Sequence, residues 1–289
     1  MFFTEYGADF TDRTRGWIES EDDLLACIDP AARPQVMAPA RRSHFVGLDL
    51  ALVKDGTAIA IGHIEERDGM TKIVTDLVDQ IKAGEGKFAD KERLELDDVV
   101  DWVYDLSRRF YFSEGMFDHW SGIVFQQALE KKGLKSLKSV PMSRNLASDI
   151  FQNFKYLMYD RRVVLYDWPI PDGQRHSPHI AELLELQAEQ QSKHVVTVEA
   201  PNMEGKHDDL SDALVRMVWV ASQNISKPKH ISVGGGNHSA ANALPPRGDP
   251  QMLAYQRLRR SGSSPERMVP RPFRSRGSSS RGGPPGLRR

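Results

Sequence analysis

The sequence has one cysteine, no long apolar run and no secretory signal, and each of these absences narrows the class of protein. Cys27 has no second cysteine with which to pair, so an internal disulfide framework and a cysteine-rich zinc site are both excluded, and a reducing compartment is expected. No apolar run approaches the ~20 residues of a membrane-spanning helix, and the N-terminus lacks the pattern of a signal peptide. We therefore expect a cytoplasmic protein with no membrane partner.

The formal net charge of −1 hides two parts of opposite sign. From residue 227 to the C-terminus, 13 lysines and arginines face 2 acids, a net of +11, which leaves −12 on residues 1–226. An acidic globular part that binds a polyanion needs local basic patches or bound metal ions. The basic tail is expected to add sequence-independent attraction to phosphates.

Composition divides the chain into three segments. Residues 1–40 hold several aromatic residues and prolines but are too short for a domain, so we interpret them as an arm or linker whose aromatics pack on a partner or on a domain absent from this chain. Residues 41–225 carry regular apolar patterns and contain the predicted fold. Residues 226–289 are rich in Gly, Pro and Ser without a periodic apolar pattern, which predicts a disordered basic tail.

The order of the predicted elements indicates an α/β protein. Residues 44–66 form two apolar runs around a Lys-Asp-Gly turn, and a third strand at 72–81 follows the turn at Asp68-Gly69, so a three-stranded meander is expected. Strands and helices then alternate. Helices are predicted at 96–110, 122–132, 144–159, 179–190 and from 210 onward, and strands at 115–119, 137–142, 163–166 and 194–199. Such an order predicts a mixed sheet covered by helices.

Three carboxylates stand at the start of the last predicted helix: Asp208, Asp209 and Asp212. One acid there is explained as a helix cap or by the helix dipole, and Asp212 with Arg216 has the spacing of an ordinary surface pair. Three like charges so close together repel each other unless a positive group lies between them. A divalent cation such as Mg²⁺, which prefers carboxylate oxygens, would remove this cost.

Two more acids occupy strand positions. Asp49 interrupts the apolar first strand, where a solvent-facing position is the alternative explanation, and Asp118 ends the fourth strand. In α/β sheets, functional groups gather at strand ends and helix N-termini, so Asp49 and Asp118 are expected to converge with the acids of the last helix.

This order of acids resembles that of the ribonuclease-H-like nucleases and resolvases. Within that group, three segments resemble the nuclease domain of the large terminase subunit of tailed bacteriophages: GLDLALVKDGTAIAI, MFDHW and HDDLSDALVRMVWVA. The resemblance covers about residues 41–225, and residues 6–29 resemble the segment that leaves the ATPase domain of those proteins. The ATPase half is missing, because no G-x-x-x-x-G-K-S/T motif occurs. The chain is therefore expected to be a nuclease fragment, or its motor to be encoded separately.

The resemblance implies a fold, a chemistry and partners. The fold is a ribonuclease-H-like mixed sheet, with an antiparallel meander extended by parallel strands and with helices on both faces. The activity is that of an endonuclease with two Mg²⁺ or Mn²⁺ ions, which cuts concatemeric viral DNA during genome packaging. The expected partners are double-stranded DNA, the portal protein, the small terminase subunit and an ATPase motor, in the host cytoplasm at the procapsid.

By the same resemblance, Asp49 bridges the two metal ions, Asp118 is an outer ligand, and the remaining ligands are Asp209 with Asp208 or Asp212. The catalytic residues are then Asp49, Asp118 and Asp209. The sequence does not choose among the three acids of the last helix.

Basic and histidine side chains near these acids are candidates for binding DNA or water. The predicted DNA contacts are Lys54, Arg144, Lys155 and Lys206. Arg161 and Arg162 extend this basic surface, although cations are also favoured at a helix C-terminus. His119 and His207 flank the acids, where each positions a water or serves as a hydrogen-bond partner.

Two alternatives to a terminase nuclease fit the same residues. A resolvase or transposase-like nuclease would share the hairpin and the acids but prefer four-way junctions. A catalytically silent packaging or scaffold module would use the acids as helix caps and the tail to bind DNA or portal protein.

Overall fold

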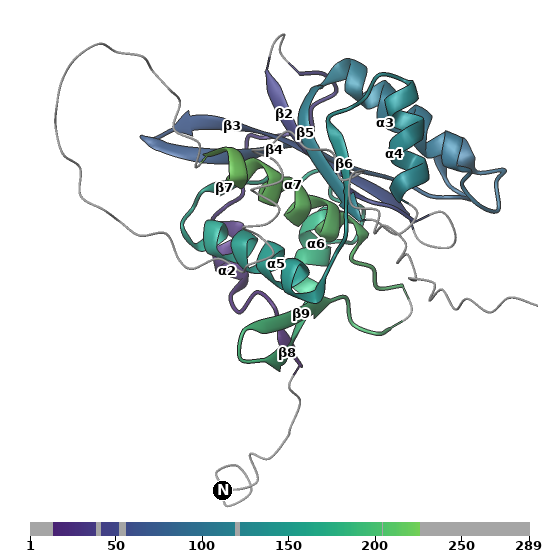
Figure 1. Cartoon of the computed structure of the whole chain (residues 1–289). Coiled ribbons are helices and arrows are strands. Elements are labelled where there is room, and N and C mark those ends of the chain that lie inside the picture. The colour runs from purple at the N-terminus through teal and green to yellow at the C-terminus, as the bar shows by residue number, and fades with distance from the viewer. Residues whose placement is uncertain (1–13, 39–41, 52–55, 119–121, 204, 226–289) are drawn as a thin grey trace, which may run out of the picture. The chain divides into compact units, whose positions relative to one another are not determined.

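A six-stranded mixed sheet lies at the centre of the computed structural model, which describes residues 14–38, 42–51, 56–118, 122–203 and 205–225 (Figure 1). The strand order is β6-β5-β2-β3-β4-β7. The meander consists of β2 (Ser43–Asp49), β3 (Thr57–Arg67) and β4 (Met70–Ile81), which pair antiparallel. The parallel strands are β5 (Tyr111–Asp118), β6 (Leu137–Val140) and β7 (Val163–Val164). The predicted meander extended by parallel strands is therefore confirmed.

Local sequence explains the central hairpin. Asp68 and Gly69 link β3 to β4, and both have positive φ, at 57° and 73°. Positive φ at both central residues is the requirement of a type I′ turn, whose twist matches that of the strands on either side. The strand β2 is buried over its whole middle, because helices cover both of its faces.

The helices form two layers, one on each face of the sheet (Figure 1). One layer consists of α3 (Leu96–Arg109) and α4 (Gly122–Lys131), which pack with Val46 and Leu48 of β2. The other consists of α2 (Glu21–Leu25), α5 (Arg144–Tyr159), α6 (Pro178–Glu185) and α7 (Asp209–Ile225), which share a core with Phe45. A short 3₁₀ helix, η1, spans Gly86–Phe88. Among the described residues, no helix is long and apolar enough to cross a membrane.

A second, three-stranded sheet corrects the helix predicted at 179–190. That helix ends at Glu185, and the following residues form β8 (Gln187–Ser192), which pairs with β1 (Thr14–Gly16) and β9 (Val195–Glu199). The residues of β8 have ordinary helix propensity, but pairing with strands on both sides outweighs such a weak local preference. The main-chain amide of Trp17 also donates to the carbonyl of Leu186, at 2.8 Å, which fixes the chain between α6 and β8.

The described part of the predicted arm packs into the core of this chain. Trp17 is 3% exposed and meets the ring of Phe151 edge-on, with 5.2 Å between ring centroids. Leu24 of α2 is fully buried in the same cluster. The aromatic side chain of Trp17 therefore has its partner within this chain. The segments at 1–13 and 226–289, which include the predicted tail, lie outside the described residues.

Candidate functional site

Two parallel strands and the last helix bring the predicted acids together. Gly47 of β2 pairs with Met116 of β5, and two residues later these strands end in Asp49 and Asp118. The helix α7 crosses β2 at Gly47, where an added Cβ would overlap the carbonyl oxygen of Ala213. Only glycine allows this close approach. The first turns of α7 therefore lie against the end of β2 that carries Asp49.

The positive group between the acids is the guanidinium of Arg216. Its Nη1 donates to Asp49 Oδ1 at 2.5 Å and to the carbonyl of Leu48 at 2.8 Å, and its Nη2 donates to Asp212 Oδ2 at 2.6 Å. Arg216 is 6% exposed. Burial lowers the pKa of Arg216, but the carboxylates of Asp212 and Asp49 outweigh this effect and hold its pKa above the usual value. The alternative of an ordinary surface pair between Asp212 and Arg216 therefore does not hold, because the guanidinium is buried and joins two partly buried acids.

The electrostatics of Asp212 show that one guanidinium does not neutralise the acids. Burial raises the pKa of Asp212 well above its usual range, and the carboxylates of Asp49, Asp208 and Asp209 raise it further, against the lowering effect of Arg216. The side chain of Asp212 still reaches solvent, with 24% of its surface exposed. Additional positive charge would therefore be favoured at this position.

Asp208 and Asp209, the other two acids near the start of α7, have different partners. Asp208 precedes the helix, and its Oδ2 accepts from the amide of Ala200 at 3.0 Å. Asp209 is 6% exposed, and its Oδ2 accepts from Gln80 Nε2 at 2.8 Å and from the amide of Gly56 at 3.2 Å. Asp208 is thus tied to the end of β9, and Asp209 to the strands β3 and β4.

Glu182 of α6 caps the helix that carries these acids. Its Oε2 accepts from the amides of Leu210 and Ser211, at 3.0 and 3.1 Å. Burial raises the pKa of Glu182 to about 8. Sequence analysis missed this residue, because an acid on an amphipathic helix carries no signal of a distant partner. Since Glu182 supplies the side-chain cap, capping does not explain the three acids of α7.

A cleft of about 440 Å³ opens beside these acids. Asp118, Asp208, Asp212 and Arg216 line it on one side. The other walls come from the start of α5, including Arg144, and from the β8–β9 hairpin. Asp49 borders the cleft through its bond to Arg216. The acids that converge here come from β5, from α7 and from the residue that precedes α7.

Of the predicted DNA contacts, Arg144 lines the cleft, whereas Lys155 and Lys206 are bonded to other parts of the chain. Arg144, at the first position of α5, lines the cleft. Lys155 donates to the carbonyl of Trp17 at 2.9 Å and to Glu19 at 3.1 Å, and Lys206 pairs with Glu185 at 2.5 Å. Lys54 lies outside the described residues.

The remaining candidates lie apart from the cleft lining. Arg161 pairs with Asp23 of α2 at 3.0 Å, and Arg162 donates to the carbonyl of Thr71 at 3.1 Å. Both arginines therefore connect segments of the fold. His207 is half-buried in the loop before α7, and His119 falls outside the described part of the chain.

The residues around the cleft suit a hard divalent cation. Mg²⁺ and Mn²⁺ prefer carboxylate oxygens. Asp118, Asp208 and Asp212 line the cleft, and Asp49 is joined to this lining by its bond to Arg216. Burial raises the pKa of Asp212 most, and the neighbouring carboxylates of Asp49, Asp208 and Asp209 raise it further, so a cation placed among these acids would be stabilised. The choice of ligands among the acids of α7 stays a prediction.

Comparison with known proteins identifies the fold. The chain matches no protein-family model and no curated protein. Its structure is similar to the large terminase nuclease from thermophilic phage G20c, with a TM-score of 0.51 and 15% identity over 68% of this chain and 95% of that chain. The same nuclease with bound magnesium gives a TM-score of 0.50 and 15% identity, over 68% and 93% of the two chains.

The large terminase of bacteriophage HK97 is also similar, with a TM-score of 0.53 and 16% identity. The match covers 72% of this chain but only 44% of the HK97 protein. The chain thus spans nearly all of the G20c nuclease and less than half of the HK97 large terminase. At these identities the likeness establishes the fold. The chain has the ribonuclease-H-like fold of large terminase nuclease domains, as the three sequence segments predicted.

Proposed function

We propose that this chain is a divalent-metal-dependent DNA endonuclease, and that it forms the nuclease part of a large terminase that cuts concatemeric viral DNA during packaging. The observation that carries the proposal is the convergence of acids at one edge of the fold. Asp49 and Asp118 end neighbouring strands, and Asp212 of α7 is joined to Asp49 by Arg216. The likeness to terminase nucleases, one of them with bound magnesium, supports the assignment.

In this proposal the acids hold two Mg²⁺ or Mn²⁺ ions. Asp49 would be the ligand shared by both ions, Asp118 would be an outer ligand, and Asp209 with Asp208 or Asp212 would complete the set. The chemistry that such ions supply when bound is activation of a water and neutralisation of the leaving 3′ oxygen. The protein itself orients the carboxylates, through the bonds of Arg216 to Asp49 and Asp212 and through the cap that Glu182 places on α7.

Binding of DNA must overcome the negative charge of the folded part. Residues 1–226 carry a net charge of −12, so DNA needs positive groups close to the cleft. Arg144 lines the cleft and is proposed to bind a backbone phosphate there. The tail, with a net charge of +11, is proposed to add non-specific attraction. The further partners are the ATPase motor, the portal protein and the small terminase subunit, at the procapsid in the host cytoplasm.

A cleavage panel tests the proposal. The full chain is incubated with supercoiled plasmid, linear duplex or a four-way junction, in Mg²⁺, Mn²⁺ or EDTA. The terminase interpretation predicts that plasmid and linear duplex are cut with either metal ion and left intact in EDTA. A marked preference for the junction would instead identify a resolvase. DNA that stays intact under all conditions would contradict both nuclease interpretations and favour the catalytically silent packaging module.

A further inference from the structure

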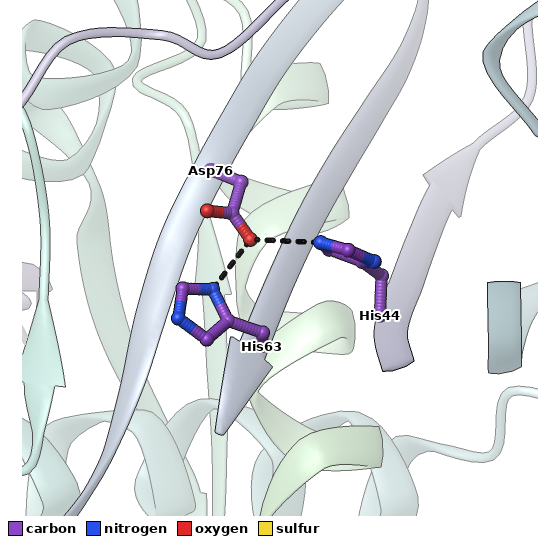
Figure 2. A group of neighbouring side chains, drawn as sticks. All are labelled: His44, His63 and Asp76. Atoms are coloured by element: carbon purple, nitrogen blue, oxygen red, sulfur yellow. Dashed lines mark hydrogen bonds and ion pairs between the residues drawn. The ribbon is translucent and has the colours of Figure 1, made fainter. Parts of the chain in front are cut away.

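Two histidines and an aspartate meet inside the sheet, at the end away from the acidic cleft. Figure 2 shows His44 of β2, His63 of β3 and Asp76 of β4, which point toward one another. They are 0%, 3% and 0% exposed. Asp76 Oδ2 lies 2.7 Å from His63 Nδ1 and 3.5 Å from His44 Nε2. One ligand atom from each residue lies within 4.8 Å of the others.

A β-bulge brings Asp76 to this position. Ile61 pairs with Leu77 and Gly62 pairs with Thr75, so Asp76 is the extra residue between them. A bulge interrupts the alternation of a strand and re-aims a side chain. Leu77 packs against the core under α3, and Asp76 contacts its histidines on that same face. The backbone of β4 therefore departs from regular pairing at the one residue that carries the carboxylate.

His44 is a buried polar side chain without a standard hydrogen bond. Neither ring nitrogen makes a hydrogen bond of ordinary geometry among the described residues: Nε2 has Asp76 Oδ2 at 3.5 Å, and the main chain of Tyr111 and Arg42 offers weak contacts. The ring of His44 meets that of Phe110 edge-on, with 5.3 Å between centroids. A buried polar group without ordinary hydrogen bonds destabilises the fold unless a ligand satisfies it. Burial lowers the pKa of His44, which favours the neutral imidazole and leaves a lone pair available to a ligand.

Another buried histidine shows the ordinary arrangement. The ring of His179 also meets an aromatic ring, that of Tyr166, at 4.7 Å between centroids. Its Nε2 lies 2.8 Å from the carbonyl oxygen of Tyr166, and its Nδ1 lies 3.3 Å from Ser177 Oγ. Both nitrogens of His179 therefore have partners. The long 3.5 Å contact of His44 with Asp76 therefore does not follow from burial alone.

Further contacts orient the other two side chains. Gln35 Nε2 donates to Asp76 Oδ1 at 2.8 Å, which leaves Oδ2 facing the histidines. Glu65 Oε2 lies 3.4 Å from His63 Nε2, on the side of the ring away from Asp76. A carboxylate behind a histidine and an amide behind a carboxylate are typical of groups that fix metal ligands in place.

We propose that His44, His63 and Asp76 bind one transition-metal ion, such as Zn²⁺, which joins the strands β2, β3 and β4. Two imidazoles and one carboxylate suit Zn²⁺ or Co²⁺ better than Mg²⁺. Three protein ligands leave the fourth tetrahedral position to a water. When the ion binds Nδ1 of His63, the imidazole carries its single N–H on Nε2, the nitrogen that faces Glu65 Oε2 at 3.4 Å.

The distances in the cluster agree with this proposal. Metal–ligand bonds of ~2.0–2.1 Å place tetrahedral ligand atoms about 3.3 Å apart. His44 Nε2 and Asp76 Oδ2 are already 3.5 Å apart. His63 Nδ1 and Asp76 Oδ2, which are 2.7 Å apart in their hydrogen bond, would need to separate by less than ~1 Å. His44 precedes Asp49 by five residues on β2, or about 16 Å, so this ion is separate from those proposed for the acidic cleft.

Cobalt binding to the full chain tests the proposal. The protein is stripped with a chelator, returned to buffer with excess Mg²⁺ to fill sites built from oxygen ligands, and titrated with Co²⁺ while visible absorption is recorded. We expect one Co²⁺ per chain, with the intense absorption of a tetrahedral nitrogen-containing site. Added Zn²⁺ is expected to abolish this absorption. A rise in melting temperature should accompany the binding.

Three variants locate the ion. His44→Gln and His63→Gln are expected to lose the absorption, whereas His179→Gln, which removes the other buried histidine, should keep it. If either glutamine variant does not fold, Asp76→Asn retains the side-chain volume and provides the same test. The proposal is overturned if the parent chain gives no tetrahedral Co²⁺ absorption in excess Mg²⁺. Absorption that survives in the variants of His44, His63 or Asp76 also overturns it.

Discussion

Replacing Arg216 with methionine would remove the guanidinium that joins Asp49 to Asp212, while keeping an apolar stem of similar length. The three side chains are 7%, 23% and 24% exposed, so the two acids would remain close together and largely desolvated. Removing one partner of a buried ion pair costs about 3–5 kcal/mol. In a domain of this size, each kcal/mol lowers the melting temperature by ~2–4 °C, so a loss of roughly 6–20 °C is expected in EDTA.

The response to metal ions distinguishes this account from a simple loss of stability. In the parent, an added cation shares the acids with Arg216, whereas in Arg216→Met the cation no longer competes with that guanidinium. Mg²⁺ or Mn²⁺ should therefore raise the melting temperature of the variant more than that of the parent. A free concentration of 100 times the dissociation constant contributes about 2.7 kcal/mol.

Thermal melts followed by circular dichroism, with and without metal ions, measure both effects. The matched control is Arg175→Met, which removes an arginine that is 80% exposed and pairs with Glu21. Such an exposed pair contributes little to stability, so its melting temperature should stay close to that of the parent. The reasoning is refuted if Arg216→Met melts like the parent in EDTA, or if metal ions stabilise both proteins equally.

Three further predictions concern Glu182, the choice of metal ion and the tail. Because the pKa of Glu182 is raised to about 8 in the folded state, the folded protein binds the extra proton, and its free energy of unfolding falls as pH rises from ~4.5 toward 8. Glu182→Gln lacks this titration, so the free energy of unfolding of the variant, relative to that of the parent, should increase with pH in melts across that range. A difference between variant and parent that does not change with pH would contradict the assignment. Mn²⁺ should support plasmid cleavage, whereas Ca²⁺ should raise the melting temperature but give little cleaved product. Equal cleavage rates with Mn²⁺ and Ca²⁺ would count against a strict coordination geometry at the acids. Removing residues 227–289 should weaken DNA binding and flatten the slope of log affinity against log salt concentration. Identical slopes for the full and truncated chains would exclude a DNA-binding role for the tail, and this result is expected if the tail docks on a portal protein instead.

The meander and most of the helices could be predicted from the sequence because their signals are local. The alternating apolar runs around the turn at Asp68-Gly69 define the register of β3 and β4, and Ser143 Oγ accepts from the amide of Leu146, as expected of a helix cap. The predicted helix at 179–190 was wrong over its last four residues, 187–190, which belong to β8, for a related reason. The local pattern of these residues favours a helix, and only their pairing with β1 and β9 makes them a strand.

The acids were found from their types and positions, but their surroundings depend on contacts between distant segments. Arg216 was considered only as a surface partner of Asp212, because the sequence does not show that α7 buries it against Leu48. Glu182 carries no sequence signal for its bonds to the start of α7. The cluster around Asp76 was also missed, because a single-residue bulge is invisible in the apolar pattern.

The cleavage of plasmid by Asp49→Asn tests the central claim most directly. Asparagine keeps the volume of Asp49 but loses the charge that a bridging ligand of two cations needs. The control is Asp172→Asn, at an exposed acid that does not line the cleft. With both variants shown to be folded, we predict that Asp172→Asn cuts at the parental rate in Mn²⁺ and that Asp49→Asn gives no product. Cleavage by Asp49→Asn at the parental rate would contradict the account.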